Sequence, residues 1–198
     1  QSGGFDENGS MLKQGRVRIA CSPNPFAQSF LQELVLEDGY IHIEGDAAEG
    51  HLSITLWVDV AKPVIHLQFV AGYELSLSVS YETWRHADRA VDSQSYELFQ
   101  CKEVWGDPVR PVTLYRDRIE VTAQDEITFY HRNHNEDLSF DREMDAQGLR
   151  DHKAGLFNPQ RNLTTGGLMK MAGMRYVTNQ AGRYADTDFV GYRFESIK

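Results

Sequence analysis

The sequence predicts an all-β protein whose strands are antiparallel. Its apolar runs are short and alternate with polar residues, as in strands with one face on a core and one in water. Turn-forming residues recur about every eight to twelve positions, and strong helical patterns are absent. About ten strands with this spacing indicate a sandwich or a barrel and argue against a parallel α/β sheet.

The chain between Leu12 and Val60 carries this pattern most clearly. We expect four strands here, at Arg16–Cys21, Glu33–Leu36, Tyr40–Glu44 and Leu52–Val60. The Asp38-Gly39 pair can supply the positive φ angles of a tight hairpin turn, so these strands should form an antiparallel meander. The period of two predicts that the following side chains are buried: Val17, Ile19, Ile41, Ile43, Leu56 and Val58.

Alternating runs also predict strands later in the chain, at Val64–Phe69, Leu75–Tyr81, Ile119–Thr122, Ile127–Arg132, Gly166–Val177 and Tyr192–Ile197. Helices should be few and short. Phe140–His152 has moderate helical character that Gly148 weakens, and another short helix is expected near Ser93–Cys101. A length of 198 residues suits a single β-sandwich domain over residues 1–198.

The charge balance limits the classes of partner. The chain has 20 basic and 29 acidic residues, which gives a formal net charge of -9. An acidic surface repels phosphate groups, so neither nucleic acid nor an anionic membrane is an expected partner. No cofactor is expected either, because a Gly-rich phosphate loop is missing from the sequence. Residue 1 is not methionine, and we expect the chain to be a fragment of a longer multidomain protein.

The two cysteines are Cys21 and Cys101. Cys21 falls on the inward face of its predicted strand, which favours a buried free thiol over a reactive one. A bridge to Cys101 stays open, because two cysteines allow one pairing and the sequence shows no geometry.

The densest polar cluster at a strand end is the run from His131 to Asn135. Residues three apart in a strand point to opposite faces, so His131 and His134 should not share a metal ion. Oxygen ligands between Asn133 and Asp137 could suit calcium, but the glycine and the spacing of an EF-hand loop are missing. We therefore expect a solvated loop here and no metal site.

Motifs for nucleophilic catalysis are missing, since there is no Gly-x-Ser-x-Gly elbow and neither cysteine adjoins a histidine. A converging carboxylate pair for glycoside chemistry stays open, because any two of the 29 acidic residues could meet in the fold. The tryptophans Trp57, Trp84 and Trp105 could stack on sugar rings beside Arg, His and Asn side chains. Alternatively, a second sheet or a helical domain covers them.

Several segments resemble one known domain family. Phe5–Gly9, Leu12–Arg18 and Ser22–Phe26 are similar to the N-terminal β-supersandwich of large bacterial glycoside hydrolases of the α-L-fucosidase-like type. Further segments follow in a similar order and spacing, at Gln32–Ile43, Leu56–Val64, Trp84-Arg85 and Phe129–Asn133. The resemblance covers most of the chain.

The resemblance implies a galactose-mutarotase-like supersandwich, in which two large twisted antiparallel sheets pack face to face. In that family the domain precedes an (α/α)6 barrel that carries the catalytic acid and base, and a periplasmic or secreted location is implied. The strands that precede the Asp-Glu-Asn-Gly segment in the family are missing here, and nothing follows Lys198, so catalysis is expected outside this polypeptide.

We therefore expect a non-catalytic domain of a carbohydrate-processing protein, with no catalytic residue of its own. Its expected partners are a glycan or oligosaccharide and a covalently linked catalytic helical-barrel domain. Two alternatives stay open. One is a stand-alone sugar-acting enzyme with a carboxylate pair, and the other is a purely structural or interaction domain.

Two clusters at strand ends form the candidate carbohydrate site. They consist of Trp84, Arg85 and His86, and of His131, Arg132 and Asn133. Because loops gather at the ends of a sandwich, both clusters could form one polar and aromatic rim. Guanidinium forks, ring nitrogens and an amide would bind hydroxyl groups, and the indole would supply a stacking face. In the alternative, Arg85 and Arg132 pair with nearby acids while Trp84 fills the core.

Overall fold

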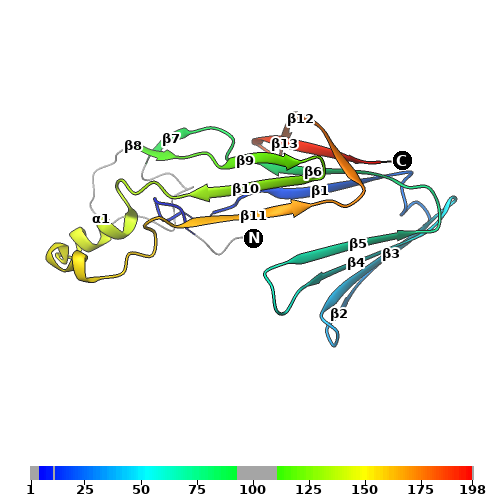
Figure 1. Cartoon of the computed structure of the whole chain (residues 1–198), viewed down its shortest axis with the longest axis horizontal. Helices are drawn as coiled ribbons and strands as arrows, with labels where there is room; N and C mark the ends of the chain where they lie inside the picture. Colours follow the sequence, from blue (N-terminus) through cyan, green and yellow to red (C-terminus); the bar gives the residue numbers. More distant parts are fainter. Residues whose placement is uncertain (1–4, 11, 93–110, 198) are drawn as a thin grey trace. The chain divides into compact units, whose positions relative to one another are not determined.

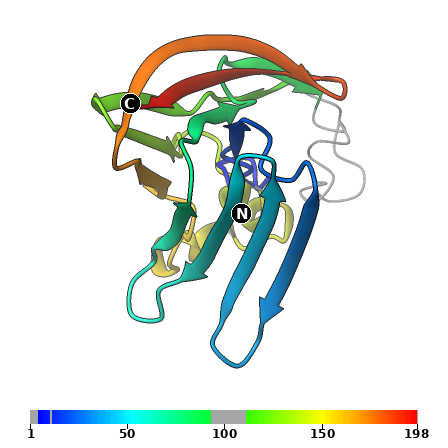
Figure 2. The ribbon, with the colours of Figure 1, turned by 90° about the vertical axis from the view of Figure 1, so that its right-hand side faces the viewer.

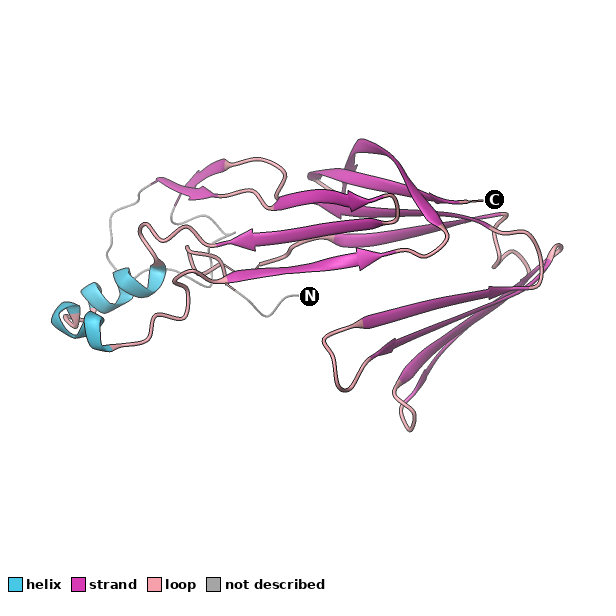
Figure 3. Cartoon of the chain, in the orientation of Figure 1, coloured by secondary structure: helices cyan, strands magenta, loops and turns pink. Residues whose placement is uncertain are grey.

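The structure is a computed structural model that describes residues 5–10, 12–92 and 111–197. Antiparallel strands dominate the described residues. Their helices are two short segments that follow each other in the second half of the sequence (Figures 1 and 3). The predicted all-β sandwich class with few short helices is confirmed. The predicted helix near Ser93–Cys101, together with Cys101 and Trp105, lies outside the described residues.

The elements in chain order are β1 (Arg16–Ser22), β2 (Ser29–Val35), β3 (Tyr40–Ala47), β4 (Gly50–Val58), β5 (Ile65–Ala71), β6 (Ser76–Thr83), β7 (Arg89–Asp92), β8 (Pro111–Leu114), β9 (Arg118–Ala123), β10 (Glu126–Arg132), α1 (Ser139–Ala146), the 3-10 helix η2 (Arg150–Gly155), β11 (Thr164–Lys170), β12 (Met174–Tyr184) and β13 (Thr187–Ser196). The described strands form four sheets, of order β1-β6-β13-β12, β11-β10-β9, β2-β3-β4-β5 and β7-β8.

The chain divides into two compact units. The first contains the chain up to Arg18 and the segment Ser80–Phe194, and the second contains Ile19–Val79 and the chain from Glu195. Whether residues 1–198 act as one domain stays a prediction.

The core of the first unit lies between β6 and the β11-β10-β9 sheet. Tyr81 of β6 stacks on Phe129 of β10, with ring centroids 4.3 Å apart and planes 19° apart. Ile127 and Phe194 are fully buried nearby in the same unit. Gly167 of β11 lies opposite Phe129, and a Cβ there would come 2.9 Å from the Phe129 ring. The glycine therefore sits in a strand because an aromatic ring lies over its backbone.

The second unit contains the predicted meander, as β2-β3-β4-β5 (Figure 2). Gly39 has φ +73° in the turn between β2 and β3, which confirms the predicted hairpin. β1 does not belong to this sheet, contrary to the prediction, because it pairs with β6. A strand's own alternation reveals which of its faces is apolar but not which neighbour it will pair with.

One face of this meander is apolar at every position except Gln32. The strand registers place on it Phe30, Leu34, Ile41, Ile43, Gly45, Ala47, Leu52, Ile54, Leu56, Val58, Ile65, Leu67, Phe69 and Ala71. The predicted face assignment is therefore right, but the predicted burial is partly wrong. Ile19, Ile41, Ile43 and Leu56 are half-buried, whereas Val17 and Val58 are 49% and 60% exposed. Val58 is the last residue of β4, beyond the buried Leu52 and Ile54. The apolar face of β4 is therefore buried at Leu52 and Ile54 but exposed at the end of the strand.

Several boundaries differ from the predictions. β2 begins at Ser29 rather than at Glu33, and β13 begins at Thr187 rather than at Tyr192. The predicted strand Gly166–Val177 is two strands, β11 and β12, joined by a turn in which Gly173 has φ +76°. The predicted helix Phe140–His152 ends at Ala146, because Gly148 adopts φ +72° and a separate 3-10 helix follows. Both glycines take up a left-handed backbone that a side chain would disfavour.

Cys21 is half-buried rather than fully buried, and burial raises the pKa of its thiol. Among the described residues it has no disulfide partner.

Candidate functional site

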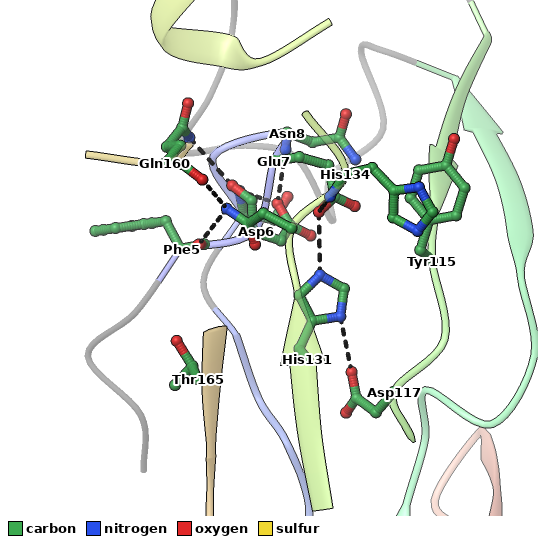
Figure 4. Close-up of polar contacts among 12 residues, drawn as sticks. Phe5, Asp6, Glu7, Asn8, Tyr115, Asp117, His131, His134, Gln160 and Thr165 are labelled. Atoms are coloured by element: carbon green, nitrogen blue, oxygen red, sulfur yellow. Dashed lines mark hydrogen bonds and ion pairs between the residues drawn. The ribbon is translucent and has the colours of Figure 1, made fainter. Parts of the chain in front are cut away.

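Five charged side chains of the first unit form a buried charged cluster: Asp6, Glu7, Arg85, Asp117 and His131. Figure 4 shows Asp6, Glu7, Asp117 and His131. The five side chains come from the N-terminal turn, the segment after β6, the segment before β9 and the end of β10. Residues far apart in the sequence are joined here by ion pairs that burial shields from solvent.

The N-terminal turn is built by its own sequence. The Asp6 carboxylate accepts hydrogen bonds from the backbone N–H groups of Asn8 (3.0 Å) and Ser10 (2.8 Å). The Gly9 N–H donates to the Asp6 carbonyl at 2.9 Å, and Gly9 has φ +77°, a conformation that glycine adopts without strain. The Asn8 amide donates to the Thr113 carbonyl of β8 at 2.9 Å. This turn fixes the directions in which Asp6 and Glu7 point.

His131 lies between two carboxylates, as Figure 4 shows. Its Nε2 is 3.0 Å from Glu7 Oε2, and its Nδ1 is 3.1 Å from Asp117 Oδ1. Burial alone would lower the pKa of His131, but the hydrogen bonds to Asp117 and Glu7 outweigh it and raise the pKa to about 9. Burial would likewise raise the pKa of Glu7, whereas the hydrogen bond from His131 holds it below its usual value. His131 is therefore an imidazolium at neutral pH and donates from both nitrogens.

Arg85 joins the remaining members of the cluster. Its guanidinium donates to Asp117 Oδ1 at 3.0 Å, to Asp6 Oδ2 at 3.3 Å and to the Tyr115 carbonyl at 2.9 Å. Burial raises the pKa of Asp6, and the charge of Arg85 opposes that rise. The guanidinium also lies 3.4 Å from His131 Nδ1, so the two cations share Asp117 between them.

Four of the five members are sealed from solvent, and the Arg85 side chain is 14% exposed. Glu7 and His131 are each 1% exposed, and Asp117 is 6% exposed. Among the described residues, no three His, Cys, Asp or Glu side chains are arranged as metal ligands. The arrangement holds four chain segments together through buried ion pairs.

The structure brings together three of the six predicted site residues. Arg85 and His131 meet in the cluster, and Asn133 is buried beside it. The Asn133 amide donates to the Gln160 carbonyl at 3.1 Å and to the Phe5 carbonyl at 3.5 Å. The two predicted strand ends therefore do meet, but His131 and Asn133 are buried and Arg85 is half-buried, so the three side chains form no exposed rim.

The other three predicted residues lie apart from the cluster. Trp84 is half-buried, and the Lys13 ammonium lies 4.6 Å from the centroid of its ring, so a cation covers the predicted stacking face. His86 is exposed and has no hydrogen bond to the described residues. Arg132 is exposed and bonds to Thr164 at 3.2 Å and to Asn162 at 3.4 Å, not to an acid.

Two further aromatic contacts bear on the predictions. Trp57 stacks on His66 of the neighbouring strand, with ring centroids 4.7 Å apart, so part of its exposed face is covered within its own sheet. His134 stacks on Tyr115 at 3.7 Å, while His131 points to Glu7 and Asp117. The two histidine rings therefore engage different partners.

Gln160 is a buried residue beside the cluster that the sequence did not single out. It is buried, and its side-chain amide donates to the Asp6 carbonyl at 3.1 Å and to Ser139 Oγ at 2.7 Å. Its side-chain carbonyl accepts the backbone N–H of Phe140 at 2.8 Å. Gln160 thus connects the N-terminal turn to the start of α1.

Asp6, Glu7 and Asp117 were missed as well. The Asp-Glu-Asn-Gly run reads as a solvated turn, and Asp117 follows no recognisable motif. The only signal in the sequence was Arg85 and His131 at the ends of two apolar strands, because buried strand ends with charges need counter-charges.

No helix in the described part of the chain is long and apolar enough to cross a membrane. Searches of curated proteins and of solved structures gave no match to this sequence. A family model described as "Domain of unknown function (DUF5703)" matches residues 1–198. Since that match spans the whole sequence, the chain belongs to the DUF5703 family.

Proposed function

We propose that this chain is a non-catalytic β-sandwich domain of a periplasmic or secreted carbohydrate-processing protein. In this proposal it contacts glycan, and it supports or lines the active site of a linked (α/α)6 catalytic domain. The observation that carries the non-catalytic part is the position of His131, which is 1% exposed and bonded through both ring nitrogens to carboxylates.

A general acid or base has to reach the proton that it transfers, directly or through one water. His131 cannot do so, because Glu7 and Asp117 already occupy both of its nitrogens. The same two acids are poor candidates for a glycosidase pair. Such a pair needs the sugar between its carboxyl groups, but here the imidazole ring of His131 fills that position.

Polar and aromatic groups at the end of β10 support contact with a glycan. Arg132, His134 and Asn135 are exposed there, and His134 is stacked on Tyr115. Asn135 and Asn162 exchange two hydrogen bonds of 2.8 Å, so the loop after β10 is tied to the loop before β11. A surface of amides, a guanidinium and rings on fixed loops suits the hydroxyl groups and the C–H faces of sugars.

A separate observation supports a role as an interaction domain. The apolar face of the β2-β3-β4-β5 sheet carries large exposed side chains such as Phe30, Leu34 and Ile65. Faces of this kind are typical of protein contacts, and a linked helical domain is a suitable partner for it. This role does not conflict with glycan contact by the first unit.

The proposal is tested by titrating the chain with a panel of neutral and acidic oligosaccharides in a calorimeter. Saturable binding is expected with at least one class of glycan, with a dissociation constant in the range of micromolar to millimolar. Absence of binding across the panel would contradict the glycan-binding role. The role as an interaction domain would then be the remaining candidate.

A further inference from the structure

The first unit contains an open pocket of about 760 Å³ beside α1 and η2. Six of its lining residues carry the argument: Asp141, Lys153, Phe157, Asn158, Arg161 and Asn162. Pockets that hold small ligands have volumes of about 300–1,000 Å³, so this one has room for a sugar unit. We propose that it binds a sugar carrying an anionic group, an inference that rests on the proposed function.

The loop that lines the pocket is fixed before any ligand binds. Buried Gln160 lies in the middle of it and is held to α1 and to the N-terminal turn. Its backbone N–H donates to the Asn158 side chain at 2.9 Å. Asn162 has φ +59°, a left-handed backbone that asparagine tolerates better than most residues, and its N–H is bonded to Asn135 at 2.8 Å. A pre-formed loop lowers the entropy cost of binding.

The acceptor atoms of the pocket are already engaged. Both Asp141 oxygens accept bonds, one from Arg161 at 3.0 Å and one from Asn158 at 3.4 Å. The side-chain carbonyl of Asn158 accepts the Gln160 N–H, and that of Asn162 accepts the Asn135 amide at 2.8 Å. Hydroxyl protons of a ligand therefore have to share acceptor oxygens that the protein already uses.

The donors of the pocket are used less fully. Among the described residues, the Lys153 ammonium has one ion-pair partner, Asp145 at 2.7 Å, and the Arg161 guanidinium has one, Asp141 at 3.0 Å. An ammonium has three N–H groups and a guanidinium has five, so most of their donors remain available. The pocket therefore favours a ligand that brings acceptors.

The charges around the pocket also favour an anionic ligand. The lining contains two cations, Lys153 and Arg161, and one carboxylate, Asp141. The Asp145 carboxylate beside Lys153 also contacts Arg150 at 3.1 Å, so three cations stand against two carboxylates and the local net charge is +1, although the whole chain has a net charge of -9. Surface charges farther away than about 8 Å are screened at physiological salt, so the local cations decide what binds. A guanidinium fork matches a carboxylate or a sulfate in geometry as well as in charge.

The apolar part of the pocket supplies the sugar-ring contact. Phe157 is 85% exposed and Leu156 is 50% exposed, both on the pocket wall. An exposed aromatic ring next to cations and amides offers the flat apolar surface on which the C–H face of a pyranose packs. The chemistry of the pocket thus combines a ring platform with an anion-binding edge.

Calorimetric titration with three probes tests the inference: a galacturonate oligosaccharide, its carboxyl-reduced neutral form, and a sulfated galactan oligosaccharide of the same length. We expect an anionic probe to bind, the neutral form to bind on the order of tenfold more weakly, and the affinity to fall with added salt. The two anionic probes distinguish a carboxylate from a sulfate as the preferred group. Affinities of both anionic probes that do not exceed the affinity of the neutral form would overturn the anionic assignment.

Substitutions of pocket residues test whether the anionic probe binds in the pocket. Arg161→Gln, Lys153→Met and Phe157→Ala should each weaken binding of the anionic probe at least about fivefold, with unchanged thermal unfolding. Lys170→Met is the matched control, because Lys170 is an exposed lysine of β11 whose nearest acid, Glu126, is 3.9 Å away. Wild-type affinity in all three pocket variants would overturn the pocket but leave glycan binding, and hence the proposed function, standing. Failure of every glycan to bind would overturn both.

Discussion

His131 Nε2 lies 3.0 Å from Glu7 Oε2, a contact between residues 124 positions apart in the sequence. It joins the N-terminal turn to the end of β10, and the Asp117 carboxylate continues the chain of contacts to the segment before β9. A buried ion pair of this kind contributes little net stability when complete, but the loss of one partner leaves a charge buried without compensation. The predictions for the first unit follow from this asymmetry.

Replacement of His131 by alanine should lower the free energy of unfolding by about 3 kcal/mol, because Glu7 and Asp117 would lose their shared cation while remaining buried. Urea unfolding followed by circular dichroism measures this. Arg132→Ala on the same strand is the control, since Arg132 is exposed and should cost less than about 1 kcal/mol. Similar losses for the two variants would show that the cluster has no special role.

The stability of the first unit should fall as the pH rises from neutral to alkaline. The pKa of His131 is about 9 in the folded chain against 6.5 in an unfolded one. Its protonated form therefore contributes stability that is fully present below pH 6.5 and is lost as the pH rises through 9. The expected loss is on the order of 2 kcal/mol.

The pH profile has an internal control. His131→Gln removes the titrating ring and should flatten the alkaline limb of a plot of unfolding midpoint against pH. On the acid side, the hydrogen bond to His131 lowers the pKa of Glu7. The ion pair therefore stabilises the folded chain above the usual Glu pKa of 4.5, and this stabilisation is lost as the pH falls. An alkaline limb that persists unchanged in His131→Gln would refute the assignment.

Gly166→Ala should destabilise the β11-β10-β9 sheet by about 1–3 kcal/mol. A Cβ at Gly166 would collide with the Phe129 carbonyl oxygen and come 2.8 Å from Tyr130 Cα, both atoms of the neighbouring backbone that cannot move aside as a side chain can. Gly155→Ala is the matched control, because a Cβ there meets nothing within 4 Å. Thermal unfolding of both variants checks this, and equal midpoints would contradict it.

Asn133→Ala and Trp84→Ala separate a structural role from a binding role in the predicted rim. Asn133→Ala should lower stability by about 2 kcal/mol, because the Gln160 carbonyl loses a buried donor, and it should leave glycan affinity unchanged. Trp84→Ala should also leave affinity unchanged, since Lys13 lies over the indole ring. A loss of glycan affinity in either variant at unchanged stability would restore the original rim.

Much of the fold could be predicted from local patterns. The period of two predicted β1, β3 to β6 and β10, and Asp38-Gly39 marked a hairpin, because strand alternation and turn chemistry are properties of a few neighbouring residues. The prediction for β2 covered only its last three residues. Strand pairing was harder, since β1 alternates like a meander strand yet pairs with β6. The depth of burial was also beyond local reasoning, as the exposed Val17 and Val58 show.

The candidate site was predicted only in part, for a related reason. Arg85, His131 and Asn133 stood out because polar residues ended apolar strands, and they do meet in space. Their partners Asp6, Glu7 and Gln160 lie in polar, turn-forming segments outside the predicted strands and helices. Whether such a turn is buried depends on contacts over more than a hundred residues, which no local pattern records.

The central claim, that the chain contacts glycan without catalysis, is tested most directly by the rate of glycoside hydrolysis. The chain is incubated at high concentration with a panel of aryl glycosides and oligosaccharides, beside its Glu7→Gln and Asp117→Asn variants. The account predicts no release above the buffer blank for all three proteins, because both carboxylates are sealed and bonded to His131. Release by the wild-type chain that either variant abolishes would contradict it.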